Sequence, residues 1–357
     1  MFMSNPAAQP SPNRTQIETA SSWRVSGDFG VDKLTFDSVP VSQPERGQVL
    51  VKMKAASLNY RDLLVATGKY NPKLHKPMTL CSDGAGEVVA VGEGVARFKA
   101  GDRVMSSFFQ NWVSGPYTRA VGKSALGGGI DGVLTSARIF DEQGLVAVPT
   151  HLSYEEAATL PCAAVTAWHA MVPTAHLSSG QTVLLLGTGG VSIFGLQFAK
   201  MHGARAIITS SSDEKLARAK TLGADEVINY KRTPDWDKEV LRLTGGEGAD
   251  VVLEVGGVGT LPYSLRSVKF GGQVSLIGVL AGINDPLNIG PILHGNVRVQ
   301  GIYVGSVEMF EAMNGAITAN QLKPVVDRAF PFKESPQAIK HIESGQHFGK
   351  IVISIEN

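Results

Sequence analysis

The chain has 357 residues, of which 43% are hydrophobic and 18% are charged, and its formal net charge at pH 7 is +1. This composition excludes a disordered chain, and the length favours two domains over one core. The near-zero charge argues against nucleic-acid and anionic membrane partners, and no apolar run reaches the roughly 20 residues that span a bilayer.

The two cysteines, Cys81 and Cys162, are too few for a disulfide framework in a chain of this size. A reduced, cytoplasmic protein is therefore expected. Residues 1–22 carry no continuous apolar segment of the kind found in signal peptides. We expect them to form a flexible N-terminal tail.

Residues 23–150 predict short strands separated by turns. The stretch from Val49 to Asn59 alternates apolar and polar side chains, as a half-buried strand does. Gly92 and Gly94 then mark a turn between two later strands. This part of the sequence predicts an antiparallel β domain.

From residue 151 the pattern changes to alternating helices and strands. Ser153 and Glu156 have the spacing of a capping box that opens a helix. From Thr182 onward, short apolar strands alternate with helices, which predicts a parallel sheet covered on both faces. The chain from Met309 then predicts a helix, a strand, another helix and a final strand.

A glycine-rich turn follows the strand that begins at Thr182, and it leads directly into a helix. It reads Gly187-Thr188-Gly189-Gly190-Val191-Ser192, which fits the dinucleotide-binding pattern GxGxxG except that Ser192 replaces the third glycine. Gly187 would permit the tight turn, and Gly189 would let the backbone approach a pyrophosphate at the helix N-terminus. The order strand, turn, helix predicts a dinucleotide site.

The end of the second strand bears on which dinucleotide binds. Ser210 and Ser211 lie at this tip, and Lys215 follows on the next helix. Hydroxyl groups and a cation suit a 2′-phosphate, so NADPH is favoured. Asp213 and Glu214 come directly after the serines, and a carboxylate at this place would bind the ribose of NADH. NADH therefore remains the alternative.

Several segments, spread over almost the whole chain, resemble one family. They are SLNYRDLLVATGKY (57–70), SDGAGEVVAVGEGVARFKAGDRV (82–104), LPCAAVTAWHA (160–170), GTGGVSIFGLQFAK (187–200), LGAD (222–225) and FGKIVI (348–353). Together they resemble the medium-chain dehydrogenase/reductase superfamily, in particular its zinc-lacking, quinone-oxidoreductase-like branch. The resemblance implies an α/β protein with a GroES-like domain (residues 23–150 and 308–357), a Rossmann-type doubly wound domain (residues 151–307) and a homodimer.

Zinc-dependent members of this superfamily hold the catalytic metal with a Cys, a His and a second Cys. These positions fall on Asn59, Ser82 and Cys162 here, and the neighbouring acid falls on Asp83. An amide, a hydroxyl and one thiol do not form the tetrahedral site that zinc prefers. Residues 106–117, where those relatives carry structural-zinc cysteines, contain none. We expect no bound zinc.

Without a metal, side chains must stabilise the negative charge that develops on the acceptor. The candidates are Asn59, Tyr60 and Arg61, of which Asn59 matches the family position nearest the nicotinamide. By resemblance, Thr166 and Lys350 lie close to the cofactor, and Gly256, Gly278 and Val279 pass under its carboxamide.

Organic donors of this kind suit an electron-poor acceptor better than a simple alcohol. The sequence thus predicts an NADPH-dependent, zinc-independent oxidoreductase that transfers hydride to a quinone or an α,β-unsaturated carbonyl compound (an enone). One alternative is an alcohol or aldehyde dehydrogenase that works without metal. Another is a catalytically idle NADPH-binding protein with a structural or regulatory role.

Overall fold

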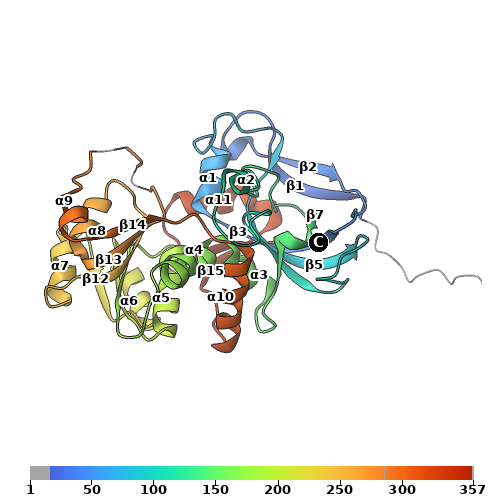
Figure 1. Cartoon of the computed structure of the whole chain (residues 1–357). Helices are drawn as coiled ribbons and strands as arrows, with labels where there is room; N and C mark the ends of the chain where they lie inside the picture. The colour runs from blue at the N-terminus through green and yellow to red at the C-terminus, as the bar shows by residue number, and fades with distance from the viewer. Residues whose placement is uncertain (1–16, 281, 285, 356–357) are drawn as a thin grey trace, which may run out of the picture.

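A computed structural model describes residues 17–280, 282–284 and 286–355. Figure 1 shows two lobes side by side, each built on its own sheet. The expected N-terminal tail largely falls on residues 1–16, outside the described residues. Its boundary at residue 22 is wrong, because strand β1 (Thr19–Val25) pairs with β2 (Thr35–Pro40) from Thr19 onward and buries Ala20 and Ser22. Within the described residues, no helix has the length and apolar character needed to cross a membrane.

The first lobe contains a seven-stranded sheet and a small three-stranded sheet. The large sheet has the order β15-β16-β3-β5-β6-β8, with β7 paired to β3. Its strands are β3 (Gln48–Leu58), β5 (Asp83–Val91), β6 (Arg103–Ser106), β7 (Ala137–Asp141), β8 (Leu145–Ala147), β15 (Val326–Pro331) and β16 (Lys350–Ser354). The small sheet adds β4 (Met78–Thr79) to β1 and β2. The expected antiparallel pairing holds throughout, except that β15 and β16 run parallel.

Strand β3 is the centre of this lobe. Its alternating sequence buries Val49, Val51 and Met53 on one face, and the strand pairs with β5, β7 and the C-terminal β16. The pairing with β16 brings the last fifty residues back to the first domain. The lobe also carries the helices α1 (Tyr60–Ala66), α2 (Arg119–Gly122), α3 (Tyr154–Ala158) and α11 (Ser335–Glu343).

The second lobe is a six-stranded sheet of order β11-β10-β9-β12-β13-β14, in which every neighbouring pair is parallel. Renumbered from β9, this is the order 3-2-1-4-5-6 of the dinucleotide-binding fold. The strands are β9 (Thr182–Leu185), β10 (Arg205–Ser210), β11 (Glu226–Asn229), β12 (Ala249–Glu254), β13 (Val268–Leu276) and β14 (Arg298–Gly301). The helices are α5 (Gly190–Met201), α6 (Asp213–Thr221), α7 (Trp236–Leu243), α8 (Leu261–Ser267) and α9 (Gly290–His294).

Both faces of this sheet are buried. Successive residues of a strand point to opposite faces, so Val183 and Leu185 pack in the cluster that contains α5. Leu184 packs on the other side with Trp236 and Leu265, from α7 and α8. This explains why the strands read as continuous apolar runs.

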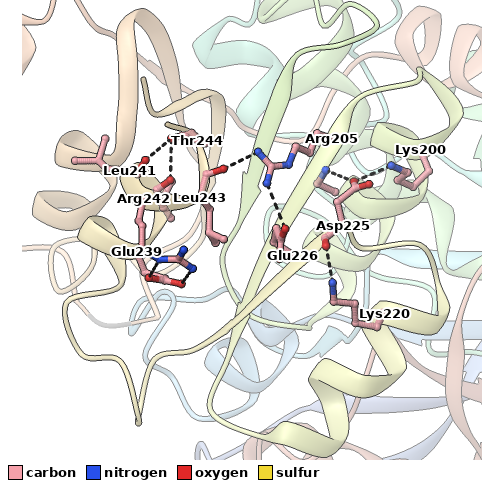
Figure 2. A network of polar contacts seen from close by, with 12 residues as sticks. Lys200, Arg205, Lys220, Asp225, Glu226, Glu239, Leu241, Arg242, Leu243 and Thr244 are labelled. Carbon is pink, nitrogen blue, oxygen red and sulfur yellow. Dashed lines mark hydrogen bonds and ion pairs between the residues drawn. The ribbon is translucent and has the colours of Figure 1, made fainter. Parts of the chain in front are cut away.

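A polar network closes the end of the sheet at which β10 and β11 begin (Figure 2). Asp225 Oδ2 accepts hydrogen bonds from Lys200 Nζ of α5 and from the backbone N–H of Ala206, both at 2.7 Å. Arg205 donates to the Leu243 carbonyl at the end of α7, at 2.8 Å. These contacts fix helices to the amino-terminal edge of the sheet, opposite the edge at which ligands bind in such folds.

The two lobes meet along helices that lie between them in Figure 1. Helix α4 (Val165–His169), which follows a π-helical turn η3 (Leu160–Ala164), packs with α10 (Val307–Ala319) in one hydrophobic cluster. A second π-helical turn, η4 (Ala170–Thr174), follows α4. The loop before β16 also reaches across, because the Gly349 N–H donates to the Thr188 carbonyl at 3.0 Å. The last strand of one lobe is thus tied to the glycine-rich turn of the other.

Candidate active site

A cavity of about 430 Å³ lies between the lobes, at the carboxyl ends of the parallel strands. One wall is the glycine-rich turn after β9 and the tip of β10. The opposite wall comes from the first lobe, through Leu58, Asn59 and the loop that precedes β16. The cavity therefore lies where the strand order of the sheet reverses, which is the ligand site of doubly wound folds.

The glycine-rich turn exposes backbone to the cavity. Gly187 has φ +73°, a left-handed conformation that favours glycine. Apart from the adjacent residues, no atom of the described chain lies within 4 Å of the place that a Cβ would take at Gly187 or Gly189, so both positions leave open space for a ligand. Ser192 fills the place of the third glycine, and its hydroxyl donates to the Leu186 carbonyl at 2.6 Å. The first turn of α5 is thus held close to β9, with its N–H groups available to a pyrophosphate.

One end of the cavity is lined by Ser210, Ser211, Lys215 and Tyr230. The Lys215 ammonium donates to the Gly345 carbonyl at 2.7 Å, which holds it across this end. The Asp213 carboxylate, which would serve NADH, instead accepts hydrogen bonds from Asn229 and Arg232 at 2.8 and 2.7 Å. This end presents hydroxyls and a cation, and the acidic residue Glu343 also lines the cavity.

The other end is built around Asn59, which precedes α1. Its backbone N–H donates to Asp62 Oδ2 at 2.7 Å, in a capping box that fixes the start of the helix. The buried Lys350 ammonium donates to Asn59 Oδ1 and to the Leu58 carbonyl, both at 2.6 Å. Because the ammonium occupies the amide oxygen, the amide nitrogen is left as the donor of Asn59. The amide nitrogen lies 3.4 Å from Ser82 Oγ, to which it can donate one hydrogen.

Ser82, Asp83 and Cys162, the other positions that match zinc ligands, do lie beside Asn59. The Asp83 carboxylate accepts from Ser82 Oγ at 2.6 Å and from the Cys162 N–H at 3.0 Å, so both oxygens are used. Burial and the neighbouring Asp83 raise the pKa of the Cys162 thiol to about 12, which keeps it protonated at neutral pH. With Lys350 already on the amide oxygen, this donor set does not fit a zinc ion. In the described part of the chain, no group of three or more His, Cys, Asp or Glu side chains has the geometry for a metal.

Most predicted site residues line this one cavity. They are Asn59, Tyr60, Gly187, Gly189, Gly190, Val191, Ser192, Ser210, Ser211, Lys215, Gly278 and Lys350. Four others do not line it. Thr166 is buried within α4, Gly256 donates its N–H to Glu254, and Val279 is exposed beside Leu280, which lines the cavity instead.

Arg61 is the fourth predicted residue that the structure places elsewhere. Its guanidinium donates to the Leu126 carbonyl and lies over the Phe108 ring, 4.3 Å from the centroid. Tyr70 covers it from another side, at 5.5 Å. The Arg61 side chain thus packs against aromatic rings and does not line the cavity.

Sequence reasoning missed two polar residues of the site. Glu254, at the end of β12, is fully buried and accepts from the N–H groups of Gly256 and Gly257 and the hydroxyls of Thr260 and Ser264, at 2.5–3.0 Å. It shapes the loop after β12. A carboxylate at the end of an apolar strand was the available signal.

His347 is the second missed residue, and it lines the cavity near Lys215. Burial and the nearby Lys215 charge lower the pKa of its imidazole to about 4, so the ring is neutral at neutral pH. It lies in a loop, where no periodic pattern could indicate that it faces a ligand.

Two family models match the two lobes. One is described as the alcohol dehydrogenase GroES-like domain and matches residues 45–150. The other is described as zinc-binding dehydrogenase and matches residues 190–319. A zinc-type alcohol dehydrogenase-like protein of Schizosaccharomyces pombe is 46% identical over 92% of this chain and 96% of its own length. The chain belongs to the medium-chain dehydrogenase/reductase superfamily, and it is an oxidoreductase of that superfamily.

Other relatives differ in the acceptor for which they are named. An acryloyl-coenzyme A reductase of Metallosphaera sedula is 30% identical, over 87% of this chain and 93% of its own. A solved protein of Sinorhizobium meliloti 1021, described as an alcohol dehydrogenase, has a TM-score of 0.89 and 42% identity, and covers 95% of this chain and 100% of its own. A quinone oxidoreductase of Pseudomonas syringae pv. tomato DC3000 has a TM-score of 0.80 and 29% identity, over 94% and 99% of the two chains. The superfamily is therefore shown, while the acceptor must be argued from the site.

Proposed function

We propose that this protein uses NADPH, without zinc, to reduce a quinone or an enone. The observation that carries the proposal is the arrangement of Asn59, Lys350 and Cys162 at one end of the cavity. We call this end, which is built around Asn59, the reaction end. At the two positions where zinc-dependent members carry metal-binding cysteines, this chain has an amide whose oxygen is bonded to an ammonium, and a protonated thiol. The relatives named for quinones and for an unsaturated thioester are in keeping with such acceptors.

A bound reduced nicotinamide supplies a hydride (two electrons and one proton) to the electron-poor carbon of the acceptor, and a proton from solvent completes the reduction. The chain's own residues bind and orient. Lys350 holds the Asn59 amide so that its N–H donates toward the cavity, where it stabilises negative charge on the acceptor oxygen. One such preorganised donor contributes roughly 3 kcal/mol at best. This is sufficient for an acceptor that already delocalises charge, and it favours enones and quinones over alcohols.

The cofactor preference rests on the other end of the cavity. Lys215, Ser210 and Ser211 can donate to a 2′-phosphate, and the carboxylate of Asp213 is engaged elsewhere. The variant K215A should raise the KM for NADPH by about tenfold or more while the KM for NADH changes less than twofold, because one charge-assisted contact is worth roughly 1.5–3 kcal/mol. The variant K220A is the matched control on the same helix, since Lys220 contacts the Asp225 carbonyl in the network of Figure 2. Equal KM values for NADPH and NADH in the unaltered protein would overturn the preference.

The reaction is tested with the purified protein by following the absorbance of the nicotinamide, with NADPH for a panel of quinones, enones and aldehydes and with NADP⁺ for alcohols. We expect turnover with quinones or enones, unchanged by chelators. The variant N59A should lower kcat by roughly 10- to 100-fold with little change in NADPH affinity. A stoichiometric zinc ion whose removal abolishes activity would refute the proposal, and so would turnover confined to alcohols.

A further inference from the structure

An aromatic cluster surrounds Arg61, which lies two residues after Asn59. Its exposed members are Tyr70, Tyr117 and Tyr303, which we call the tyrosine wall. Each keeps about two-fifths of its surface accessible (38%, 43% and 41%). The rings of Tyr117 and Tyr303 are 5.7 Å apart, and the hydroxyls of Tyr70 and Tyr303 are 2.6 Å apart. Three large side chains from distant segments thus converge on one exposed surface, which is uncommon unless something binds there.

A buried layer supports this wall. Phe109 is fully buried and contacts Tyr117 and Tyr303 edge to face, with centroids at 5.5 and 5.0 Å. Trp112 contacts Tyr117 at 5.3 Å. Edge-to-face contacts of this kind hold rings in fixed orientations. The wall is therefore preformed, as the walls of small-molecule sites usually are.

Two connections place the wall at the reaction end. Arg61, two residues after Asn59, lies between Phe108 and Tyr70 and so joins the wall to the helix that begins at the candidate catalytic amide. On the other side, His169 Nδ1 lies 2.7 Å from the carbonyl oxygen of Val304, the residue after Tyr303. His169 ends α4, which continues from the turn that carries Ala163, a residue of the cavity.

The backbone at Tyr303 is also strained. Val304 has φ +55°, a conformation that β-branched residues avoid because it costs on the order of 1–3 kcal/mol. The contact of its carbonyl with His169 helps to hold it there. Strain of this kind persists where the surrounding structure fixes a side chain for a purpose. Here the conformation fixes the direction in which Tyr303 leaves the chain.

We propose, on the basis of the proposed function, that the tyrosine wall binds the aromatic substituent of the acceptor. The preferred substrates are then aryl-substituted enones and fused-ring quinones. The wall offers ring faces and edges, and Phe108 and Tyr70 cover the Arg61 guanidinium. Burial raises the pKa of the Tyr303 phenol, so that it stays protonated at neutral pH. In this proposal, an aryl group on the β-carbon of an enone contacts the wall and the carbonyl oxygen accepts from Asn59.

The test compares two enones that differ only at the β-carbon, 4-phenylbut-3-en-2-one and pent-3-en-2-one, with NADPH in excess. Conjugation makes the phenyl compound the weaker electrophile, so a higher kcat/KM for it reports on binding. We expect at least a tenfold preference for the phenyl compound. The variants Y303A and Y117A should each reduce this preference by roughly tenfold, mainly through KM, and Y303F should retain it, because ring contacts carry the binding. The variant F36A, which removes an equally exposed ring on strand β2, should leave it unchanged.

Direct binding supplies a second readout that needs no turnover. 4-Phenylbutan-2-one should bind the complex with NADP⁺ more tightly than pentan-2-one does, and Y303A should remove the difference. Reduction of both enones with no preference would overturn this inference and leave the proposed function standing. Failure to reduce any acceptor would overturn the proposed function. Equal binding of the two saturated ketones would separately overturn the proposal that the tyrosine wall binds an aryl group. A Y303A variant that changes the oligomeric state but keeps the aryl preference would show the wall to be a protein interface, against the proposal.

Discussion

Asp62 shows how one buried acid can organise the reaction end. Its side chain is 1% exposed, one oxygen accepts from the N–H of Asn59, and the other has no hydrogen-bond partner among the described residues. Burial raises the pKa of this carboxyl to about 6, although the Arg61 charge and the hydrogen bond from Asn59 oppose the shift. The acid holds the candidate catalytic residue Asn59 through its backbone N–H, and burial makes the ionised form of the acid unfavourable.

The cost of ionising Asp62 predicts how stability depends on pH. A carboxyl whose folded pKa lies above its unfolded value of about 3.9 stabilises the fold fully below that value and loses the contribution as pH rises through about 6. Between pH 4 and pH 7 the free energy of unfolding should therefore fall by up to about 3 kcal/mol relative to D62N. Urea unfolding at both pH values measures the difference. The exposed D28N variant is the control, and an identical pH slope in D62N and the unaltered chain would contradict the prediction.

At the scale of elements, the loop after β12 depends on Glu254. This buried carboxylate satisfies two backbone N–H groups and two hydroxyls, which would otherwise lose their partners inside the protein. The loop is followed by residues that line the cavity, including Gly278, whose N–H donates to the Glu254 carbonyl. The Glu254 carboxylate thus fixes the loop after β12, and the Glu254 backbone carbonyl contacts Gly278 of the cavity.

The variant E254A should lower the free energy of unfolding by roughly 2–4 kcal/mol, because three buried donors and the part-buried Thr260 hydroxyl lose this acceptor. It should also raise the KM for NADPH, since the loop no longer keeps its shape. The variant E254Q, which keeps one acceptor oxygen and the side-chain volume, should lie between E254A and the unaltered chain. Denaturant unfolding followed by circular dichroism measures the order of the three proteins. An E254A protein as stable as the unaltered chain would contradict this account.

The elements that the sequence predicted well are those whose own pattern determines their burial. The alternation from Val49 to Asn59, the capping box at Ser153 and the glycine-rich turn are local signals. The structure has the strand β3 (Gln48–Leu58), a helix start and a strand–helix turn at these places. Arg61 was misplaced because the direction of its side chain depends on Phe108 and Tyr70, which come from other segments. His347 and the tyrosine wall were missed for the same reason, since the loops that carry them have no period from which orientation can be inferred.

At the scale of the whole molecule, the parallel sheet ends at β14. All four residues of this strand are exposed, and Phe270, Ile289 and Leu293 are 80%, 66% and 74% exposed. An exposed strand edge beside apolar side chains tends to pair with another chain. The expected homodimer would cover this edge.

We expect sedimentation equilibrium to give twice the mass of the chain. The variant V299K, which places a charge on the edge strand, should shift the protein toward the monomer at micromolar concentration. A V113K variant serves as the control, because Val113 has similar exposure and lies in the other lobe. A monomeric unaltered protein would refute the expectation.

Because the cavity takes its walls from both lobes, a cofactor should stabilise the whole molecule. NADPH at 100 times its dissociation constant should raise the free energy of unfolding by about 2.7 kcal/mol. Denaturant titrations with NADPH and with NADH at equal concentration measure this effect, and the larger shift is expected with NADPH. Stabilisation of only one of two separate unfolding transitions would show that the cofactor does not join the lobes.

The link between Gly349 and the glycine-rich turn has a consequence for the synthesis of the protein on the ribosome. The turn is complete when residue 192 has been synthesised, but the opposite wall needs Lys350, which forms the start of β16. A ribosome adding some 5–20 residues per second takes on the order of ten seconds to cover that interval. During that time the nascent chain has the glycine-rich turn but not the opposite wall of the cavity. The complete nucleotide site can therefore form only after β16 has been synthesised.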